Sequence, residues 1–287
     1  MTHRAEIISI GDELTSGQRL DTNSKWISER LGELGVKTVF HTTVGDRMSD
    51  NVDAFRTAAR RADIVIASGG LGPTADDLTR EAMAIAFDAP LELRDEAIAH
   101  IESLFAMRKR PMPERNRSQA MFPKDSRIID NPHGTAPGID LIPASIFCAP
   151  EKSSRIFALP GVPAEMMQMF LSTVQVRLKQ EQGVGQKRWF FYCIKVFGIG
   201  ESDVEKMIPD LIARERDPVV GITVSKATIT LRIAALCSTE EEFQTKIQPT
   251  VAEIHDKLGM LVFAEGEIDL DEATHLLLNQ QHGMLFF

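Results

Sequence analysis

Residues 63–81 read Asp63-Ile-Val-Ile-Ala-Ser-Gly-Gly-Leu-Gly-Pro-Thr-Ala-Asp-Asp-Leu-Thr-Arg-Glu81. The first six residues have the short apolar run of a buried strand, and the rest form a glycine-rich turn that enters a helix. Gly69, Gly70 and Gly72 can take the positive φ angles of a tight turn, which lets backbone amides approach an anion. A strand, a turn and a helix in this order predict a parallel α/β sheet.

Strands and helices alternate around this stretch. We expect strands at 5–10, 36–44, 64–67, about 144–149 and 154–159, and helices from Ser24 to Gly35, at 50–61, 77–87 and 94–107, and from Pro163. A Pro/Asn/His/Gly-rich loop occupies 130–138. The alternation predicts a three-layer αβα domain over residues 1–182, with a mostly parallel sheet covered on both faces.

The pattern changes near residue 183. After a linker at 182–186 we expect a strand at 188–197, a helix at 201–213, a hairpin of strands at 219–224 and 227–236, and a helix at 240–258. This predicts a small α+β domain over 183–258. Residues 259–287 are expected to be a linker and the truncated start of a further domain, with a strand at 261–264, a helix at 269–279 and an unpaired strand at 283–287. The unpaired strand predicts disorder after about residue 266 or pairing with another chain.

Composition limits the classes of partner. The net charge is −9 and the pI is about 5.4, which argues against nucleic acid, because duplex binding needs clustered Lys and Arg. No apolar stretch has the length of a membrane span, and the N-terminus lacks a signal peptide's apolar core. The three cysteines are far apart and follow no zinc or disulfide spacing. We therefore expect a cytoplasmic protein that binds a small molecule, with no nucleic acid and no membrane.

Two acids directly follow the glycine turn. Asp76 and Asp77 would repel a bare phosphate, so either a divalent cation bridges carboxylate and phosphate, or the acids serve only the helix. Thr74 and Asp77 have the spacing of a capping box, which supports the second reading. A P-loop is excluded because no Gly-Lys-Ser/Thr is present. Gly70-x-Gly72-x-x-Ala75 fits the loose dinucleotide fingerprint, but Pro73 stiffens the loop and the strand is not the first of its unit.

Three other turns resemble this one. Gly11-Asp-Glu-Leu-Thr-Ser-Gly17 follows the first strand and leads through Asp21-Thr-Asn23 to a helix, where Asp21 and Asn23 are either ligand groups or cap residues. Asn131-Pro-His-Gly-Thr-Ala-Pro-Gly138 is rich in small residues, and its His133 is either a ligand contact or an ordinary loop residue. Leu159-Pro-Gly-Val-Pro-Ala-Glu-Met166 again joins a strand to a helix, with Glu165 in the first helical turn.

Turns at the carboxyl ends of parallel strands meet at one edge of the sheet, which is where ligands bind in such folds. We therefore predict one site for a phosphorylated ligand. The residues expected to bind or shape it are Asp12, Asp21, Asn23, Gly69, Gly70, Leu71, Gly72, Pro73, Thr74, Thr79, Asn131, His133, Gly134, Thr135, Gly138, Pro160, Gly161 and Glu165.

At these four turns the sequence resembles the N-terminal domain of the CinA (competence/damage-inducible protein) family, which is related to molybdopterin-binding domains of the MogA type. The resemblance continues through Phe197-Gly-Ile-Gly-Glu-Ser202, the start of that family's KH-like domain. The KH-like part shows no Gly-x-x-Gly clamp, so RNA binding is not expected. The chain ends where the family's C-terminal domain should begin and lacks its Ala-Glu-Ser-Cys-Thr-Gly-Gly signature, so no nicotinamide mononucleotide deamidase activity is expected.

The resemblance implies hydrolysis of the pyrophosphate of ADP-ribose, or of a similar nucleotide-sugar diphosphate, with Mg²⁺ or Co²⁺ and with K⁺ as a candidate helper. It also favours a homodimer. In this hypothesis Asp76, Asp77 and Glu13 are catalytic, Asp76, Asp77 and Asp12 hold the metal, and Asp77→Asn abolishes turnover with little loss of fold. The alternatives are a molybdopterin- or nucleotide-binding module without hydrolysis, and an inactive remnant of a longer protein.

Overall fold

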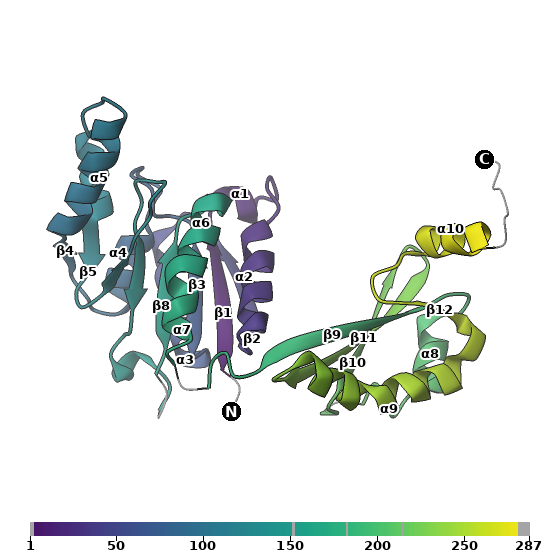
Figure 1. The fold of residues 1–287 in the computed structure, drawn as a ribbon. Helices are drawn as coiled ribbons and strands as arrows, with labels where there is room; N and C mark the ends of the chain where they lie inside the picture. The colour runs from purple at the N-terminus through teal and green to yellow at the C-terminus, as the bar shows by residue number, and fades with distance from the viewer. Residues whose placement is uncertain (1–2, 151–152, 182, 214, 281–287) are drawn as a thin grey trace. The chain divides into compact units, whose positions relative to one another are not determined.

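The computed structural model describes residues 3–150, 153–181, 183–213 and 215–280 (Figure 1). The chain divides into two compact units, residues 1–186 and 187–287. Val184 is buried in the core of the first unit, and the Gly185 amide donates a hydrogen bond to the Leu34 carbonyl. Much of the segment expected as a linker therefore packs with the first unit.

Within the described residues, the main sheet of the first unit has six strands in the order β2-β1-β3-β8-β7-β6. They are β1 (Arg4–Ile10), β2 (Lys37–Val44), β3 (Ile64–Ser68), β6 (Arg127–Ile129), β7 (Gly138–Leu141) and β8 (Arg155–Leu159). The pairs β1–β2, β1–β3 and β3–β8 are parallel, whereas β7 is antiparallel to both β8 and β6. The predicted mostly parallel α/β sheet is confirmed.

Helices cover both faces of this sheet (Figure 1). They are α1 (Asp12–Thr15), α2 (Thr22–Glu33), α3 (Met48–Arg61), α4 (Thr79–Ala86), α5 (Asp95–Met107), α6 (Pro163–Met169) and α7 (Gln175–Leu178), with a π-helical turn at Phe170–Val174. Neighbouring residues of β1 face opposite layers: Ile8 packs with α3 and α4, and Ile7 packs with α2 and α6. Burying each such side chain contributes about 1.5–3 kcal/mol, which explains the continuous apolar runs of the central strands.

One predicted strand is wrong. Residues 144–149 contain a 3-10 turn at Ser145–Phe147, and the strand beside β8 is β7, formed by 138–141. Pro143 and Pro150 flank the expected segment, and proline cannot donate to a strand ladder. The sequence analysis also missed β6, the short pair β4 (Leu91–Leu93) and β5 (Met121–Pro123), and a 3-10 helix at Glu114–Ala120.

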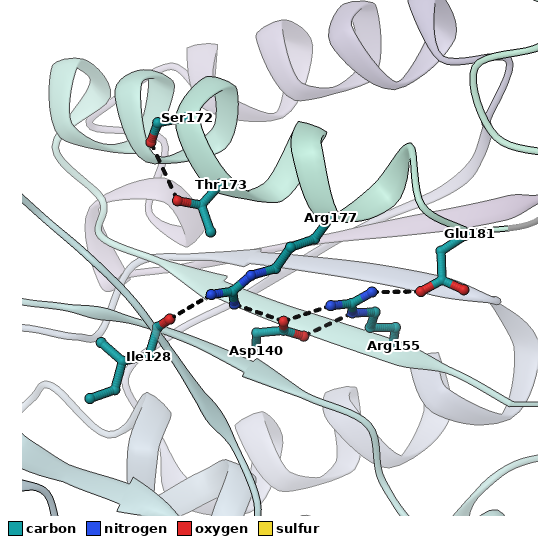
Figure 2. Close-up of polar contacts among 7 residues, drawn as sticks. All are labelled: Ile128, Asp140, Arg155, Ser172, Thr173, Arg177 and Glu181. Carbon is teal, nitrogen blue, oxygen red and sulfur yellow. Dashed lines mark hydrogen bonds and ion pairs between the residues drawn. The ribbon is translucent and has the colours of Figure 1, made fainter.

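A buried ion-pair network fixes the reversed strand β7 (Figure 2). The Asp140 carboxylate accepts hydrogen bonds from Arg155 Nε and Nη2, at 2.9 and 2.8 Å, and from Arg177 Nη1 at 2.8 Å. Arg177 Nη2 donates to the Ile128 carbonyl, and Arg155 Nη1 donates to Glu181. The network joins β6, β7 and β8 to α7. Arg155 is the first residue of β8, so the network lies away from the edge at which that strand ends.

The second unit contains an antiparallel sheet in the order β10-β11-β9-β12. Its elements are β9 (Arg188–Val196), α8 (Glu201–Met207), β10 (Val219–Ser225), β11 (Thr228–Cys237), α9 (Glu240–Leu258), β12 (Val262–Glu265) and α10 (Leu270–Gln280). The hairpin is present, with Lys226 and Ala227 both at positive φ as a type I′ turn requires. The helix expected over 201–213 ends at Met207, because Pro209 restricts the residue before it.

We expected residues 259–287 to lie outside the small α+β domain. Their first part belongs to this unit, because β12 pairs with β9. The helix expected at 269–279 is α10, so residues 270–280 are helical where disorder was one expectation. The strand expected at 283–287 lies outside the described residues.

Candidate functional site

Four turns meet at the edge where β1, β3 and β8 end. Asn23, beyond the first turn, donates a hydrogen bond to the Gly161 carbonyl at 3.0 Å. The Gly69 amide donates to the Leu159 carbonyl. β6 runs in the same direction as β8, because both are antiparallel to β7, so the loop after β6 reaches the same edge. The turns that the sequence singled out are thus joined by direct contacts.

The turns surround a cavity of about 450 Å³. Of the residues predicted to form the site, those that line it are Glu13, Gly69, Gly70, Leu71, Gly72, Pro73, Asp76, Asp77, Thr135, Pro160, Gly161 and Glu165. A neighbouring cavity of about 30 Å³ is lined by Asp21 and Asn23, and Glu13 borders both. The predicted residues that line neither cavity are Asp12, Thr74, Thr79, Asn131, His133, Gly134 and Gly138.

The glycine turn has the conformation that its sequence suggests. Gly69 and Gly70 have φ of 115° and 63°, and a Cβ on Gly69 would lie 2.2 Å from the Ile10 carbonyl oxygen. Only glycine fits such a position. The hydroxyl of buried Thr79 donates to the Gly69 carbonyl at 2.8 Å, so Thr79 holds the turn and is not available to a ligand.

Asp77 does not cap the following helix. α4 begins at Thr79, its N-cap residue is Leu78, and that residue makes no side-chain cap hydrogen bond. The Asp77 carboxylate turns back to accept hydrogen bonds from the amides of Gly72, at 2.7 Å, and Thr74, at 2.9 Å. The capping-box reading is therefore wrong for α4. Two of the amides that we expected to hold a phosphate are occupied by a carboxylate of the chain itself.

A group of acids lies beside the glycine turn. The amide of Asp12 donates to the Asp46 carboxylate, and the amide of Asp46 donates to the Asp12 carboxylate, each at 3.0 Å. Burial raises the pKa of Asp46, as do the charges of Asp12, Asp76 and Glu13, against the lowering effect of the Asp12 amide. These four carboxylates therefore interact electrostatically around one end of the cavity.

Sequence reasoning missed Asp46, although a signal was present. Asp46 follows Val44, the last residue of β2, just as Asp12 follows β1. The rule that ligand groups gather at carboxyl ends of parallel strands applies equally to both. Arg19 was also missed, and it lines both cavities, where its guanidinium can meet an anionic ligand.

The loop after β6 is organised by its first residue. Asn131 is fully buried; its Oδ1 accepts from the amides of His133 and Gly134, and its Nδ2 donates to the Ala136 carbonyl and to Glu165 at 2.7 Å. Asn131 thus shapes the loop and ties it to α6, in place of the expected ligand contact. His133 is exposed and lies outside the cavity lining. Thr135 is the polar side chain that this loop presents to the cavity.

Three predicted residues serve local structure. Asp21 caps α2 by accepting from the Ser24 amide at 2.9 Å, and its carboxylate also accepts from the hydroxyls of Ser9 and Ser24. A Cβ on Gly134 would lie 2.1 Å from the Glu165 carboxylate, so a larger residue there would displace the Glu165 side chain. Gly138 belongs to β7, where a Cβ would lie 2.7 Å from the Ala158 carbonyl oxygen.

The donor set suits a hard cation. Carboxylate oxygens of Asp12, Asp46, Asp76 and Glu13 are ligands that Mg²⁺ accepts, and Mg²⁺ commonly uses only one or two carboxylates together with waters and substrate phosphates. In the described part of the chain, no group of three or more His, Cys, Asp or Glu side chains is arranged to hold a metal ion. The residues therefore fit a cation that is completed by its ligand rather than enclosed by protein.

Comparison with known proteins identifies both units. Residues 6–180 match the family described as probable molybdopterin binding domain, and residues 193–264 match the KH domain of damage-inducible protein CinA. The chain belongs to the CinA family. The resemblance noted in the sequence and the assignment of the fold to the molybdopterin-binding class are confirmed.

Relatives within the CinA family match along most of this chain. A CinA-like protein from Dictyoglomus thermophilum is 39% identical over 279 residues, which cover 97% of this chain and 65% of that protein. A putative competence-damage inducible protein from Clostridium novyi is 37% identical over 278 residues, which cover 96% of this chain and 64% of that protein. The chain thus spans about two thirds, or slightly less, of the length of these curated relatives.

A solved structure supports the fold of the first unit. The protein CinA from Thermoplasma acidophilum, whose function is described as unknown, is 32% identical and superimposes with a TM-score of 0.53 over 61% of this chain and 98% of its own.

Among the described residues, no helix is both long and apolar enough to cross a membrane.

Proposed function

We propose that the cavity binds a nucleotide diphosphate, with ADP-ribose as the first candidate, and that the protein hydrolyses its pyrophosphate bond with a divalent cation. The observation that supports this most is the meeting of the Gly69 turn with four interacting carboxylates in and around one cavity. A phosphate needs the amides and the cation, whereas the carboxylates alone would repel it. The choice of ADP-ribose comes from the family resemblance.

The hydrogen bonds of the acids suggest which of them could bind the metal. Both oxygens of Asp77 are hydrogen bonded within the glycine turn, so the metal role falls to exposed Asp76 and to Asp12 with Asp46. A bound Mg²⁺ or Co²⁺ would lower the pKa of a water and neutralise charge on the leaving phosphate. K⁺ remains a second candidate ion.

The remaining groups bind and orient the ligand. Glu13 borders both cavities, and in this proposal it accepts a proton from the attacking water. Arg19 can pair with a phosphate oxygen, since its guanidinium is a strong donor to such groups. Thr135 and the turn at Pro160–Gly161 would contact the second phosphate or the ribose.

A direct assay tests this function. Purified protein is incubated with ADP-ribose and Mg²⁺ or Co²⁺, and AMP and ribose 5-phosphate are measured by chromatography. We expect both products in equal amounts, and a loss of about 10²-fold or more in kcat for Glu13→Gln and Asp76→Asn. Asp53→Asn, an exposed acid on α3, serves as the matched control and should leave the rate unchanged. Equal rates for all four proteins would contradict the assignment.

The second candidate is a binding module without hydrolysis. It is favoured by the description of the matching family as a molybdopterin binding domain and by the lack of a preformed group of three metal-ligating side chains in the described residues. The same cavity would then bind a pterin phosphate. Titration with molybdopterin separates the two, because a binding module would bind it in the presence of EDTA and would release no AMP from ADP-ribose.

A further inference from the structure

The anion position of the glycine turn is already filled. Asp77 Oδ1 accepts from the Gly72 amide, and its Oδ2 accepts from the Thr74 amide and, at 2.5 Å, from the Thr74 hydroxyl. Backbone amides that converge on one concavity are a general anion-binding arrangement. A Cβ on Gly72 would lie 2.3 Å from Asp77 Oδ2, so the carboxylate is packed directly against the turn. A ligand phosphate cannot use these donors while Asp77 stays there.

Arg80 lies three residues later, in the first turn of α4, and its side chain is only 2% exposed. Its Nε and Nη2 atoms are buried and have no hydrogen-bond partner among the described residues. Buried guanidinium N–H groups without an acceptor are costly, since they have left water and formed no hydrogen bond in return. Burial lowers the pKa of Arg80 to about 10, while the charges of Glu81 and Asp77 act in the opposite direction.

Glu81 is an unsuitable partner for Arg80 despite its proximity. Successive residues of a helix point in different directions and do not face each other. Glu81 Oε2 is itself buried without a hydrogen bond, so the two groups do not satisfy each other in this structure. Asp77 is three residues before Arg80 and already interacts with it electrostatically. Asp77 is therefore our candidate partner for Arg80 once its carboxylate leaves the turn.

We propose that Asp77 holds the anion position of the glycine turn only in the free protein, that a ligand phosphate takes this position on binding, and that the displaced Asp77 carboxylate pairs with Arg80. After the exchange each of these groups has a partner: the Gly72 and Thr74 donors pass from carboxylate to phosphate, and Arg80 gains the acceptor that its Nε and Nη2 atoms lack. The inference rests on the proposed function in one respect, namely that the ligand carries a phosphate. Arg80 is a positioning residue, because it acts through Asp77.

The test is a double-mutant cycle with inorganic pyrophosphate as the probe, in EDTA, by calorimetry. Asp77→Asn removes the competing charge and should bind pyrophosphate about tenfold more tightly than the unmodified protein, or better. Arg80→Met should weaken binding about tenfold in the unmodified background and have no effect in the Asp77→Asn background. Arg80→Lys, which keeps the charge, should restore part of the loss.

Other outcomes overturn the inference. If Asp77→Asn binds no more tightly than the unmodified protein, or if neither binds pyrophosphate, Asp77 is not a displaceable anion. If Arg80→Met weakens binding equally in both backgrounds, Arg80 acts through the fold and not through Asp77. A direct readout covers the case in which the Arg80 variants do not fold: the NMR signal of Arg80 Nε–H should shift when pyrophosphate is added to the unmodified protein, and should not shift in Asp77→Asn.

The cycle is independent of hydrolysis. Pyrophosphate exchange at the turn with no release of AMP from ADP-ribose would leave the inference standing and remove the proposed activity. ADP-ribose hydrolysis without tighter pyrophosphate binding by Asp77→Asn would leave the proposed activity standing and remove the inference about Asp77 and Arg80.

Discussion

Asp12 and Asp46 hold each other by two reciprocal hydrogen bonds, each from the backbone amide of one residue to the carboxylate of the other at 3.0 Å. The pair joins the ends of β1 and β2, two neighbouring parallel strands. The contact places two negative charges close together, and burial and the charge of Asp12 both raise the pKa of Asp46. A divalent cation at this place would relieve the repulsion.

Asp46→Asn should therefore weaken the use of Mg²⁺ without lowering the stability of the fold. We expect the Mg²⁺ concentration for half-maximal activity to rise about tenfold, since one carboxylate is lost. Without metal, stability at pH 7 should rise slightly: a carboxyl whose folded-state pKa is raised contributes stability below its unfolded pKa, and that contribution is lost as the pH rises through the folded-state pKa. Thermal unfolding in EDTA measures this. A large fall in Tm would show that the Asp12–Asp46 contact serves the fold.

Asn131→Ala should disrupt the loop after β6. It removes the acceptor of two backbone amides and the donor to Ala136 and Glu165, in a fully buried position. We expect a loss of about 2–4 kcal/mol in the free energy of unfolding, measured in urea, because buried polar groups are left unpaired. His133→Ala, in the same loop but exposed, is the control and should change stability by less than about 0.5 kcal/mol. Similar values for the two variants would contradict the role assigned to Asn131.

Asp21→Ala tests the cap of α2 through its pH dependence. Burial raises the pKa of Asp21, but hydrogen bonds from the Ser24 hydroxyl and amide and from Ser9 outweigh it, so the pKa lies below the ordinary value of 3.8. A depressed pKa means that the stabilisation is present above 3.8 and is lost as the pH falls through the folded-state value. We expect the variant to be less stable by about 1–2 kcal/mol at pH 7. The difference should shrink below pH 3.8, and a difference independent of pH would count against this account.

Asp140→Asn should strongly destabilise the first unit. Asp140 is buried between Arg155 and Arg177, and the substitution removes the carboxylate that both cations share, so that Arg155 keeps its contact with Glu181 alone (Figure 2). Breaking a buried ion pair in this way costs about 3–5 kcal/mol. Glu181→Gln is the control, because the Glu181 side chain is 41% exposed and pairs with Arg155 through Nη1. We expect its effect on urea unfolding to stay below about 1 kcal/mol. Equal losses in the free energy of unfolding for the two variants would show that the burial of Asp140 does not determine the cost of its substitution.

The sequence predicted the backbone of the site better than its side chains. Apolar runs, glycines and prolines identified the turns at 11–17, 69–74 and 160–163, because these residues have strong local backbone preferences. The reversal of β7 could not be predicted in this way, since it depends on Asp140 pairing with arginines that follow it by 15 and 37 residues.

Polar side chains near a turn were harder to interpret. Asp77 and Asn131 both looked like ligand groups, but both bind amides of their own loops. Short polar side chains compete for nearby backbone donors, and the sequence does not show which donors stay free. Asp46 was missed for a different reason: its position after a strand was a signal, but its closeness to Asp12 follows only from the parallel pairing of β1 with β2.

The account requires a diphosphate to bind at the carboxyl edge of the sheet through a divalent cation. The decisive experiment is a calorimetric titration with the α,β-methylene analogue of ADP-ribose, which cannot be hydrolysed at that bond. We expect Mg²⁺ to strengthen binding about tenfold or more over binding in EDTA, and we expect this gain to disappear in the Asp46→Asn, Asp76→Asn double variant. Equal affinity with and without Mg²⁺, or a gain that survives in the double variant, would contradict the claim.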